Sequence, residues 1–130
     1  MIPDGRKGPQ AEPAGERFSK QERLIKTKDF RKVYKDGRSY RAGFIILRSL
    51  PNAASTNRLG FSISAKSKKR AFRRNRIKRL FREAYRKNKN IIKTGFDIVI
   101  VVRRDVKENF SYVEARRILL DLSKQAGILL

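Results

Sequence analysis

The chain contains no cysteine and no histidine among its 130 residues. The lack of cysteine excludes disulfide bonds, zinc–thiolate centres and cysteine nucleophiles. It also agrees with a reducing environment, so we expect a cytoplasmic protein. The lack of histidine removes the commonest general base and a common metal ligand. Enzyme classes that depend on either residue type are therefore excluded.

Long apolar runs and acidic residues are also scarce. No stretch approaches the roughly 18 consecutive apolar residues of a membrane-spanning helix, and the N-terminus lacks the apolar segment of a signal peptide. We therefore expect a soluble protein with no membrane partner. Asp and Glu number 12 against 34 Lys and Arg, a formal net charge of +22. This charge repels itself within one small domain, and a polyanion such as nucleic acid would compensate that cost.

Composition divides the chain into two parts. Residues 1–17 hold all but one of the prolines and little apolar content, which predicts a disordered N-terminal extension. An arm that becomes ordered on RNA is the alternative. Residues 18–130 are predicted to form a single RNA-binding domain, because this length suits one hydrophobic core.

The first predicted helix follows Thr27 as its N-cap and stops at Gly37. Phe30, Val33 and Tyr34 have the i, i+3, i+4 spacing of one helical face. Aromatic residues at this spacing more often belong to a core. Beside a cationic track, however, they also hold single-stranded RNA by stacking. Both interpretations of this aromatic pair stay open from the sequence.

Three segments have the residue preferences of strands. Residues 39–50 are rich in Tyr, Phe and Ile and predict one strand. Residues 59–65 alternate, with Phe61 and Ile63 on the apolar face and serines on the other, as in a half-buried strand. Residues 96–102 form a near-continuous apolar run, which is typical of a central strand covered on both faces.

Two further helices complete the predicted fold. Residues 71–88 form the longest helical pattern, and Ser111 with Glu114 forms a capping box before a last helix carrying Leu119 and Leu122. The order helix, strand, strand, helix, strand, helix predicts an α/β (α+β) two-layer sandwich, with one sheet face helix-covered and the other partly open. The strands flanking the long helix should be parallel neighbours, and the general rule predicts a right-handed crossover between them.

The long helix combines an apolar stripe with a row of cations. At about 100° per residue, the apolar residues gather on one side: Ile77, Leu80, Phe81 and Ala84. Arg74, Lys78 and Arg82 recur at i, i+4 and i+8 beside this stripe. A solvated face usually mixes charges, in i,i+4 pairs worth about 0.2–0.5 kcal/mol each, whereas here like charges repeat. A phosphate-binding surface compensates that repulsion by releasing counterions from nucleic acid.

The five residues before this helix, at 66–70, extend the basic segment. We predict them to form a loop leading to the helix N-terminus, where backbone N–H groups also favour anions. The predicted RNA-binding surface consists of Lys66, Lys68, Lys69, Arg70, Arg73, Arg74, Asn75, Arg76, Lys78, Arg79, Arg82 and Arg86.

The sequence carries no motif for catalysis by the protein itself. Its acids are scattered, with no carboxylate pair at metal-ligand spacing. A phosphate-cradling glycine loop and a nucleophile elbow are both missing. We therefore predict no catalytic residue and no metal site in this chain. An autonomous nuclease is a competing hypothesis that these absences disfavour. A structural ribosomal or RNA-packaging protein is another, since it shares the small size and high charge.

Several segments together resemble the bacterial ribonuclease P protein subunit. Residues 71–83, with Arg-Asn-Arg at 74–76, closely resemble the family's signature helix. Residues 29–37 resemble its first helix, and residues 59–64 and 95–100 resemble two of its strands. The resemblance covers most of the chain, in the same order.

The resemblance implies the ribosomal protein S5 domain 2-like fold, with a left-handed βαβ crossover around the long helix. It also implies a protein subunit of an endoribonuclease whose catalytic RNA binds Mg2+ and removes the 5′ leader of precursor tRNA. The protein would act as a monomer in a 1:1 ribonucleoprotein. It would bind the catalytic RNA through the Arg-Asn-Arg helix and the leader in a cleft between the first helix and the sheet. The residues implied for this cleft are Phe30, Tyr34 and Leu47.

Overall fold

The computed structural model of the chain describes residues 20–63, 68–104, 106 and 109–130, with residues 68–71 described by their backbone alone. The predicted extension at residues 1–17 and the predicted RNA-binding residue Lys66 lie outside these ranges. The elements in chain order are the 3-10 helix η3 (Lys20–Glu22), α1 (Thr27–Asp36), β1 (Arg38–Ala42), β2 (Ile45–Pro51), β3 (Arg58–Ile63), α2 (Lys68–Asn88), the 3-10 helix η4 (Lys89–Ile91), β4 (Phe96–Val102) and α3 (Tyr112–Gln125).

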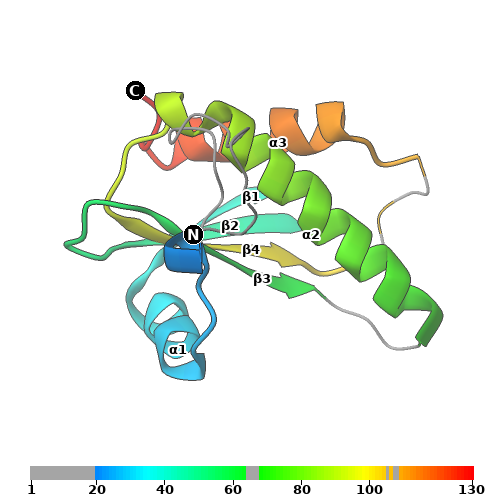
Figure 1. The fold of residues 1–130 in the computed structure, drawn as a ribbon, viewed down its shortest axis with the longest axis horizontal. Coiled ribbons are helices and arrows are strands. Elements are labelled where there is room, and N and C mark those ends of the chain that lie inside the picture. Colours follow the sequence, from blue (N-terminus) through cyan, green and yellow to red (C-terminus); the bar gives the residue numbers. More distant parts are fainter. Residues whose placement is uncertain (1–19, 64–67, 105, 107–108) are drawn as a thin grey trace, which may run out of the picture.

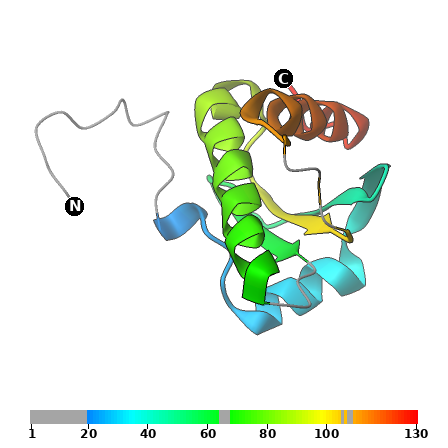
Figure 2. The same ribbon diagram turned by 90° about the vertical axis from the view of Figure 1, so that its right-hand side faces the viewer.

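In the described part of the chain, one four-stranded sheet has the order β1-β2-β4-β3. β2 pairs antiparallel with β1 and β4, whereas β3 and β4 are parallel. Helices α2 and α3 cover one face of the sheet and α1 crosses the other (Figures 1 and 2). We call these the α2/α3 face and the α1 face. The predicted α/β class and the parallel pairing around the long helix are confirmed.

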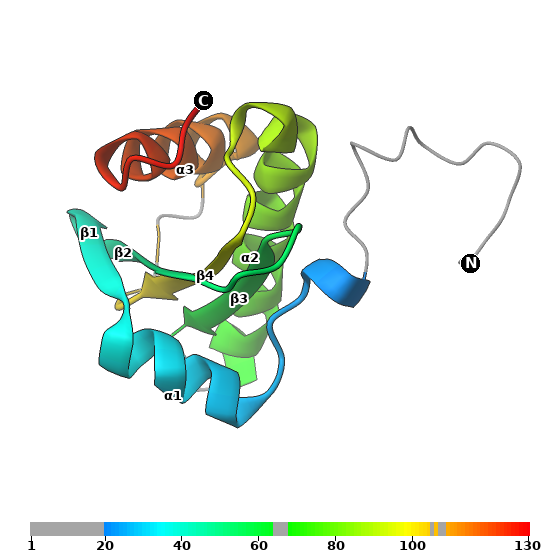
Figure 3. The ribbon, with the colours of Figure 1, turned by 90° about the vertical axis from the view of Figure 1, so that its left-hand side faces the viewer.

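The connection from β3 through α2 to β4 is left-handed. In Figure 3 both strands run away from the reader, and the chain passes from β3 up to α2 and then down to β4 on the left of β3. That turn is counterclockwise, so the crossover has the hand that the resemblance implies. The general expectation of a right-handed crossover is wrong here. The most apolar strand, β4, takes the inner position beside β2, and α2 still covers the face that buries its apolar stripe.

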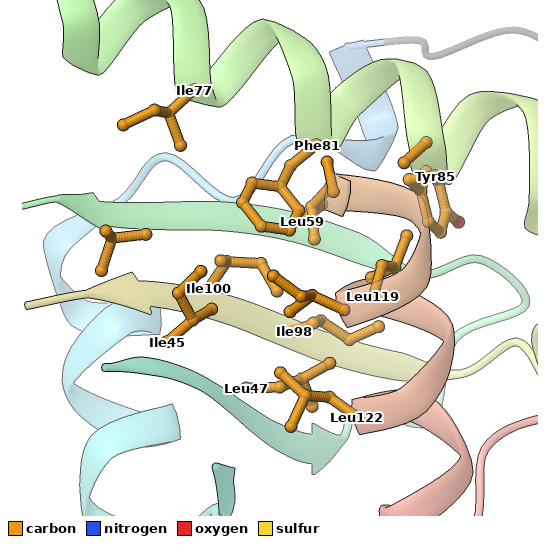
Figure 4. Close-up of a cluster of buried hydrophobic side chains, with 14 of the residues drawn as sticks. Ile45, Leu47, Leu59, Ile77, Phe81, Tyr85, Ile98, Ile100, Leu119 and Leu122 are labelled. Atoms are coloured by element: carbon orange, nitrogen blue, oxygen red, sulfur yellow. The ribbon is translucent and has the colours of Figure 1, made fainter. Parts of the chain in front are cut away.

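The main core lies on the α2/α3 face. Ile77, Phe81 and Ala84 of α2 are at most 2% exposed and Leu80 is partly buried against the same core, so the predicted stripe is confirmed. Leu119 and Leu122 of α3 complete the helical side of this core, and Figure 4 shows both groups converging on the inward side chains of the strands. The capping box is also present on the serine side, because the Ser111 hydroxyl accepts a hydrogen bond from the Glu114 N–H at 3.5 Å.

The strand predicted at residues 39–50 is in fact a hairpin. β1 and β2 are joined at Gly43, whose φ of 63° lies in the left-handed region, and Ala42 pairs with Ile45. This turn lacks the Asn-Gly or Asp-Gly pair that most clearly announces a hairpin. The apolar character on both sides of a lone glycine therefore concealed the break.

Two predicted helix boundaries are also displaced. α2 begins at Lys68 rather than Ala71, because Lys and Arg are good helix formers, so the predicted loop shortens by a turn. At α1, Thr27 is the first helical residue and Lys26 occupies the N-cap without a side-chain hydrogen bond. Neither α2, at 21 residues, nor any other helix in the described ranges is apolar enough to cross a membrane.

Candidate nucleic-acid interface

Arg74, Lys78 and Arg82 form a continuous row on the side of α2 that overhangs β3, and we call it the cationic flank. The Arg82 guanidinium lies 5.4 Å from the centroid of the Phe61 ring on β3. Burial, followed by the charges of Arg74 and Arg82, lowers the pKa of Lys78. The three cations are therefore close enough to repel one another, as their i, i+4, i+8 spacing predicts.

The other predicted RNA-binding residues of α2 lie on different sides of the helix. Asn75 and Arg79 are exposed, and helical geometry places them opposite the buried stripe. Arg73 and Arg76 share the side of Lys87, whose ammonium lies 5.2 Å from the Tyr112 ring of α3. The predicted surface thus wraps around the helix. The side chains of Lys68, Lys69 and Arg70 lie outside the described part.

Arg86 differs from the rest of the predicted set because its charge is compensated within the helix. Its Nε donates to Glu83 Oε1 at 2.8 Å, and its Nη2 donates to Oε2 at 3.0 Å. This hydrogen bond is the main reason that the pKa of Glu83 lies below its ordinary value. Lys87 also approaches the same carboxylate, at 3.8 Å. Arg86 therefore offers less uncompensated charge to a polyanion than Arg74 or Lys78.

Arg23 extends the cationic flank past the edge of the sheet, although sequence reasoning did not select it. It forms a parallel bridge with Leu59 of β3, and the next N–H, of Leu24, donates to the Leu59 carbonyl at 3.0 Å. The charge of Arg23 adds to burial in lowering the pKa of Arg82. No periodic element contains Arg23, so only its pairing with β3 reveals the position.

Glu22 anchors the segment that carries Arg23. Its carboxylate is buried and accepts hydrogen bonds from Lys89 Nζ at 2.9 and 3.0 Å. The Tyr85 hydroxyl donates to the same carboxylate at 3.4 Å, and burial, then the Glu22 charge, raises the pKa of Tyr85. Figure 3 shows η3 beside α2 and above α1. These contacts hold η3, and with it the neighbouring Arg23, against the C-terminal part of α2.

Phe30 and Tyr34 play different structural roles on the α1 face. Phe30 is half-buried against a small core of Leu24, Val33 and Val99. Its ring lies on the backbone of β3, since a Cβ on Gly60 would come within 2.6 Å of Phe30 Cζ. Tyr34 is 41% exposed. Phe30 therefore belongs to a core, as one interpretation predicts, whereas Tyr34 is accessible and its stacking on RNA stays a prediction.

Leu47 does not line this face, and the prediction for it is wrong. Its side chain is fully buried in the main core and lies beside Leu122 of α3 (Figure 4). Successive side chains of a strand point to opposite faces, so Arg48 is the residue on the α1 face. Its guanidinium lies 5.1 Å from the Tyr34 ring centroid and donates to the Tyr34 carbonyl oxygen and Ser39 Oγ.

A row of strand residues lies on the α1 face beside α1. Register places Arg41, Ile46, Val101 and Ser62 opposite one another across the four strands. Arg41 and Ser62, at the two ends of this row, are exposed. The predicted partial opening of this sheet face is therefore present.

An ion-pair cluster around Arg58 orients α1 on the sheet. Arg58 binds Asp97 of β4 through Nε and Nη2 at 2.8 and 2.7 Å, and its Nη1 donates to Asp29 of α1 at 3.3 Å. Asp29 lies about 100° around the helix from Phe30. Holding Asp29 over Arg58 therefore leaves Phe30 turned toward β3, where its ring lies against Gly60.

Within the described ranges, no group of three acidic side chains could hold a metal ion. These residues therefore do not fit a protein-bound magnesium centre. What they provide is a positively charged surface and a sheet face bordered by aromatic residues. Together with the left-handed crossover, this defines a basic α/β protein whose charge suits a polyanionic partner.

The sequence matches the family described as Ribonuclease P over residues 18–127, and the chain belongs to this family. It is 37% identical over 113 residues to the ribonuclease P protein component of Thermotoga maritima, covering 85% of this chain and 96% of that protein. The component of Clostridium botulinum strain Langeland is 38% identical over 110 residues, covering 84% and 97%.

Solved structures agree with the sequence matches. The Thermotoga maritima protein superposes with a TM-score of 0.69 at 33% identity, covering 80% of this chain and 96% of that chain. The Staphylococcus aureus protein superposes with a TM-score of 0.70 at 26% identity, covering 84% and 98%. The chain is thus a protein component of a ribonucleoprotein endoribonuclease that acts in tRNA processing, with an RNA partner.

Proposed function

We propose that the chain binds the catalytic RNA of ribonuclease P through α2 and holds the single-stranded 5′ leader of precursor tRNA beside α1. It thereby assists the endonucleolytic removal of the leader, which gives the mature 5′ end of tRNA. The active site and its Mg2+ ions belong to the RNA subunit. The protein acts as a monomer in a 1:1 complex.

The observation that carries this proposal is the position of Lys78 between Arg74 and Arg82. Burial and two neighbouring guanidinium charges lower the pKa of Lys78, so holding the Lys78 charge between them is costly in the free protein. Phosphates placed along the flank would remove that cost, and the RNA would release its condensed counterions. A continuous cationic row beside a buried stripe therefore supports an RNA duplex or folded RNA as the partner.

The proposed leader site rests on the α1 face. Tyr34 offers a partly exposed ring for stacking, which is how single-stranded RNA is commonly held. Arg48 already lies over that ring and brings a positive charge to the same place. Arg23 joins this region to the cationic flank around the β3 edge. One continuous surface would thus contact the catalytic RNA and the substrate.

Reconstitution with the cognate catalytic RNA tests the proposed function. Cleavage of leader-bearing precursor tRNA at low magnesium should rise when the purified protein is added, because the protein cations replace part of the metal's charge compensation. The RNA alone at high magnesium provides the positive control. No stimulation under those conditions would contradict the proposal.

Tyr34→Ala tests the leader site separately. Loss of one stacked base should weaken binding of leader-bearing precursor tRNA to the holoenzyme by about 5- to 150-fold, equivalent to about 1–3 kcal/mol. Leaderless tRNA should bind as before, and Tyr34→Phe should restore the affinity. Equal losses for the two tRNAs would place the leader elsewhere.

A further inference from the structure

Phe72 is a large aromatic residue that α2 presents to solvent. Its side chain is 76% exposed, whereas Ile77 and Phe81 of the same helix are almost fully buried. Helical geometry places Phe72 roughly opposite that buried stripe. Single exposed apolar residues are common on protein surfaces, so the surroundings of Phe72 decide whether it has a role.

Those surroundings are polar and cationic. Asn75, Arg76 and Arg79 follow Phe72 at i+3, i+4 and i+7, the spacings that share one side of a helix. Asn75 and Arg79 are exposed. Glu83, farther along the helix, is already held by Arg86 and approached by Lys87. An aromatic ring with an amide and guanidinium groups beside it is the combination that binds an unpaired nucleotide.

We propose that Phe72, Asn75 and Arg79 form a binding site for one unpaired nucleotide of the catalytic RNA, an inference that rests on the proposed function. The Phe72 ring stacks on the base, the Arg79 guanidinium binds a flanking phosphate, and the Asn75 amide contacts the base edge. The other contacts of this helix surface depend on charge. The contact at this site depends on the base.

The position of Phe72 separates this nucleotide from the leader. The leader site lies on the α1 face, whereas helical geometry places Phe72 opposite the buried stripe of α2, and α1 and the N-terminal end of α2 lie at opposite ends of the molecule in Figure 1. A second copy of this chain is disfavoured as the occupant, because its net charge is also +22 and the cores of protein interfaces are depleted in charge. The catalytic RNA is the partner that satisfies the ring and the cations together.

The sequence allows a direct spectroscopic test, because it contains no tryptophan. Phe72→Trp would create a single reporter that retains the stacking surface. Titration with the cognate catalytic RNA should quench the emission of this tryptophan. Leu130→Trp is the matched control, because Leu130 is 79% exposed and its N–H binds the Ile91 carbonyl beyond the far end of α2. Its emission should stay unchanged.

Binding measurements complete the test. Phe72→Ala should weaken the affinity for the catalytic RNA by about 5- to 150-fold, with an unchanged dependence on salt, since no charge is lost. Phe72→Trp should bind like the wild type. The melting temperature of each variant confirms folding, which an exposed residue should leave intact.

Three results would overturn the inference. The first is wild-type affinity of Phe72→Ala together with an unquenched tryptophan at position 72, while the wild type still binds with steep salt dependence. In that case the proposed function stands and only the stacking site fails. The second is a wild-type dimer in sedimentation that Phe72→Ala dissociates without loss of RNA affinity, which would make a second copy the occupant. The third is an absence of wild-type binding, which removes the proposed function as well.

Discussion

Leu47 and Arg48 are consecutive residues of β2 that serve opposite faces of the sheet. Leu47 packs in the main core, and Arg48 contacts Tyr34 on the α1 face. The sequence around them contains apolar residues at every position from Phe44 to Leu47, so alternation could not assign a face. Arg48 itself was the available signal, because a charged residue within an apolar strand must point to the side that water can reach.

Gly60 provides a residue-scale test of how Phe30 is positioned. A Cβ at residue 60 would lie 2.6 Å from Phe30 Cζ and 3.0 Å from Leu24 Cβ. Gly60→Ala should therefore overpack the α1 face and lower the free energy of unfolding by about 1–3 kcal/mol, as measured by urea denaturation. Ser62→Ala, at an exposed position of the same strand, is the control and should unfold like the wild type. Equal midpoints for both variants would show that α1 adapts without cost.

At the scale of the element, the cations of α2 lie on different sides of the helix. Periodicity alone predicted the buried stripe and the row from Arg74 to Arg82, and both are present. Periodicity did not predict that Glu83 would hold Arg86, because Arg86 at i+3 and Lys87 at i+4 could each have served as its partner. The pair shows that charge counted along a helix overstates the charge available to a ligand.

Glu83→Gln should release Arg86 and strengthen RNA binding. If the freed guanidinium gains one phosphate contact, the slope of log affinity against log salt should steepen by about 0.7–0.9, as measured by filter binding at several salt concentrations. Asp121→Asn removes an equal charge from an exposed position of α3 and should leave the slope unchanged. Equal gains in both variants would assign the effect to net charge alone.

The pH dependence of the Glu83–Arg86 pair follows from the lowered pKa of Glu83. A carboxylate whose pKa is lower in the folded state stabilises the fold above its unfolded pKa, and this contribution disappears as pH falls through the folded pKa. The effect of Glu83→Gln on the salt slope should therefore be full at neutral pH. It should vanish in acid, where wild-type Glu83 is itself neutral.

At the scale of the whole molecule, two ion-pair clusters connect elements that are distant in sequence. Arg58 joins Asp97 of β4 to Asp29 of α1, and Glu22 joins η3 to Lys89 beyond the end of α2. The first cluster orients α1 on the sheet, and the second places Arg23 at the sheet edge. The proposed RNA surface thus depends on contacts that span most of the chain.

Asp97→Asn tests the first cluster. Asp97 is 4% exposed, and the substitution removes the charge-assisted bidentate contact with Arg58. We expect the free energy of unfolding to fall by about 1.5–3 kcal/mol, the usual contribution of hydrogen bonds to charged groups. Urea denaturation provides the measurement, with Asp121→Asn as the exposed control. An unchanged midpoint would mean that Asp29 holds Arg58 and α1 without the Asp97 charge.

The sequence by itself determined the features that depend on local spacing. The apolar run of β4, the Ser111 cap and the stripe of Ile77, Phe81 and Ala84 arise from neighbours within a few residues, and periodicity captures such patterns. The resemblance also supplied the left-handed crossover, which the general rule contradicts.

Only the tertiary structure decided which residues share one surface. It placed Arg48 rather than Leu47 beside Tyr34, divided residues 38–51 into a hairpin at Gly43, and brought Arg23 next to Arg82. Each of these outcomes depends on pairing between segments that are far apart in the chain, and strand register decides the face of every side chain. Local pattern carries no information about such register, which is why the interface could be assembled only from the fold.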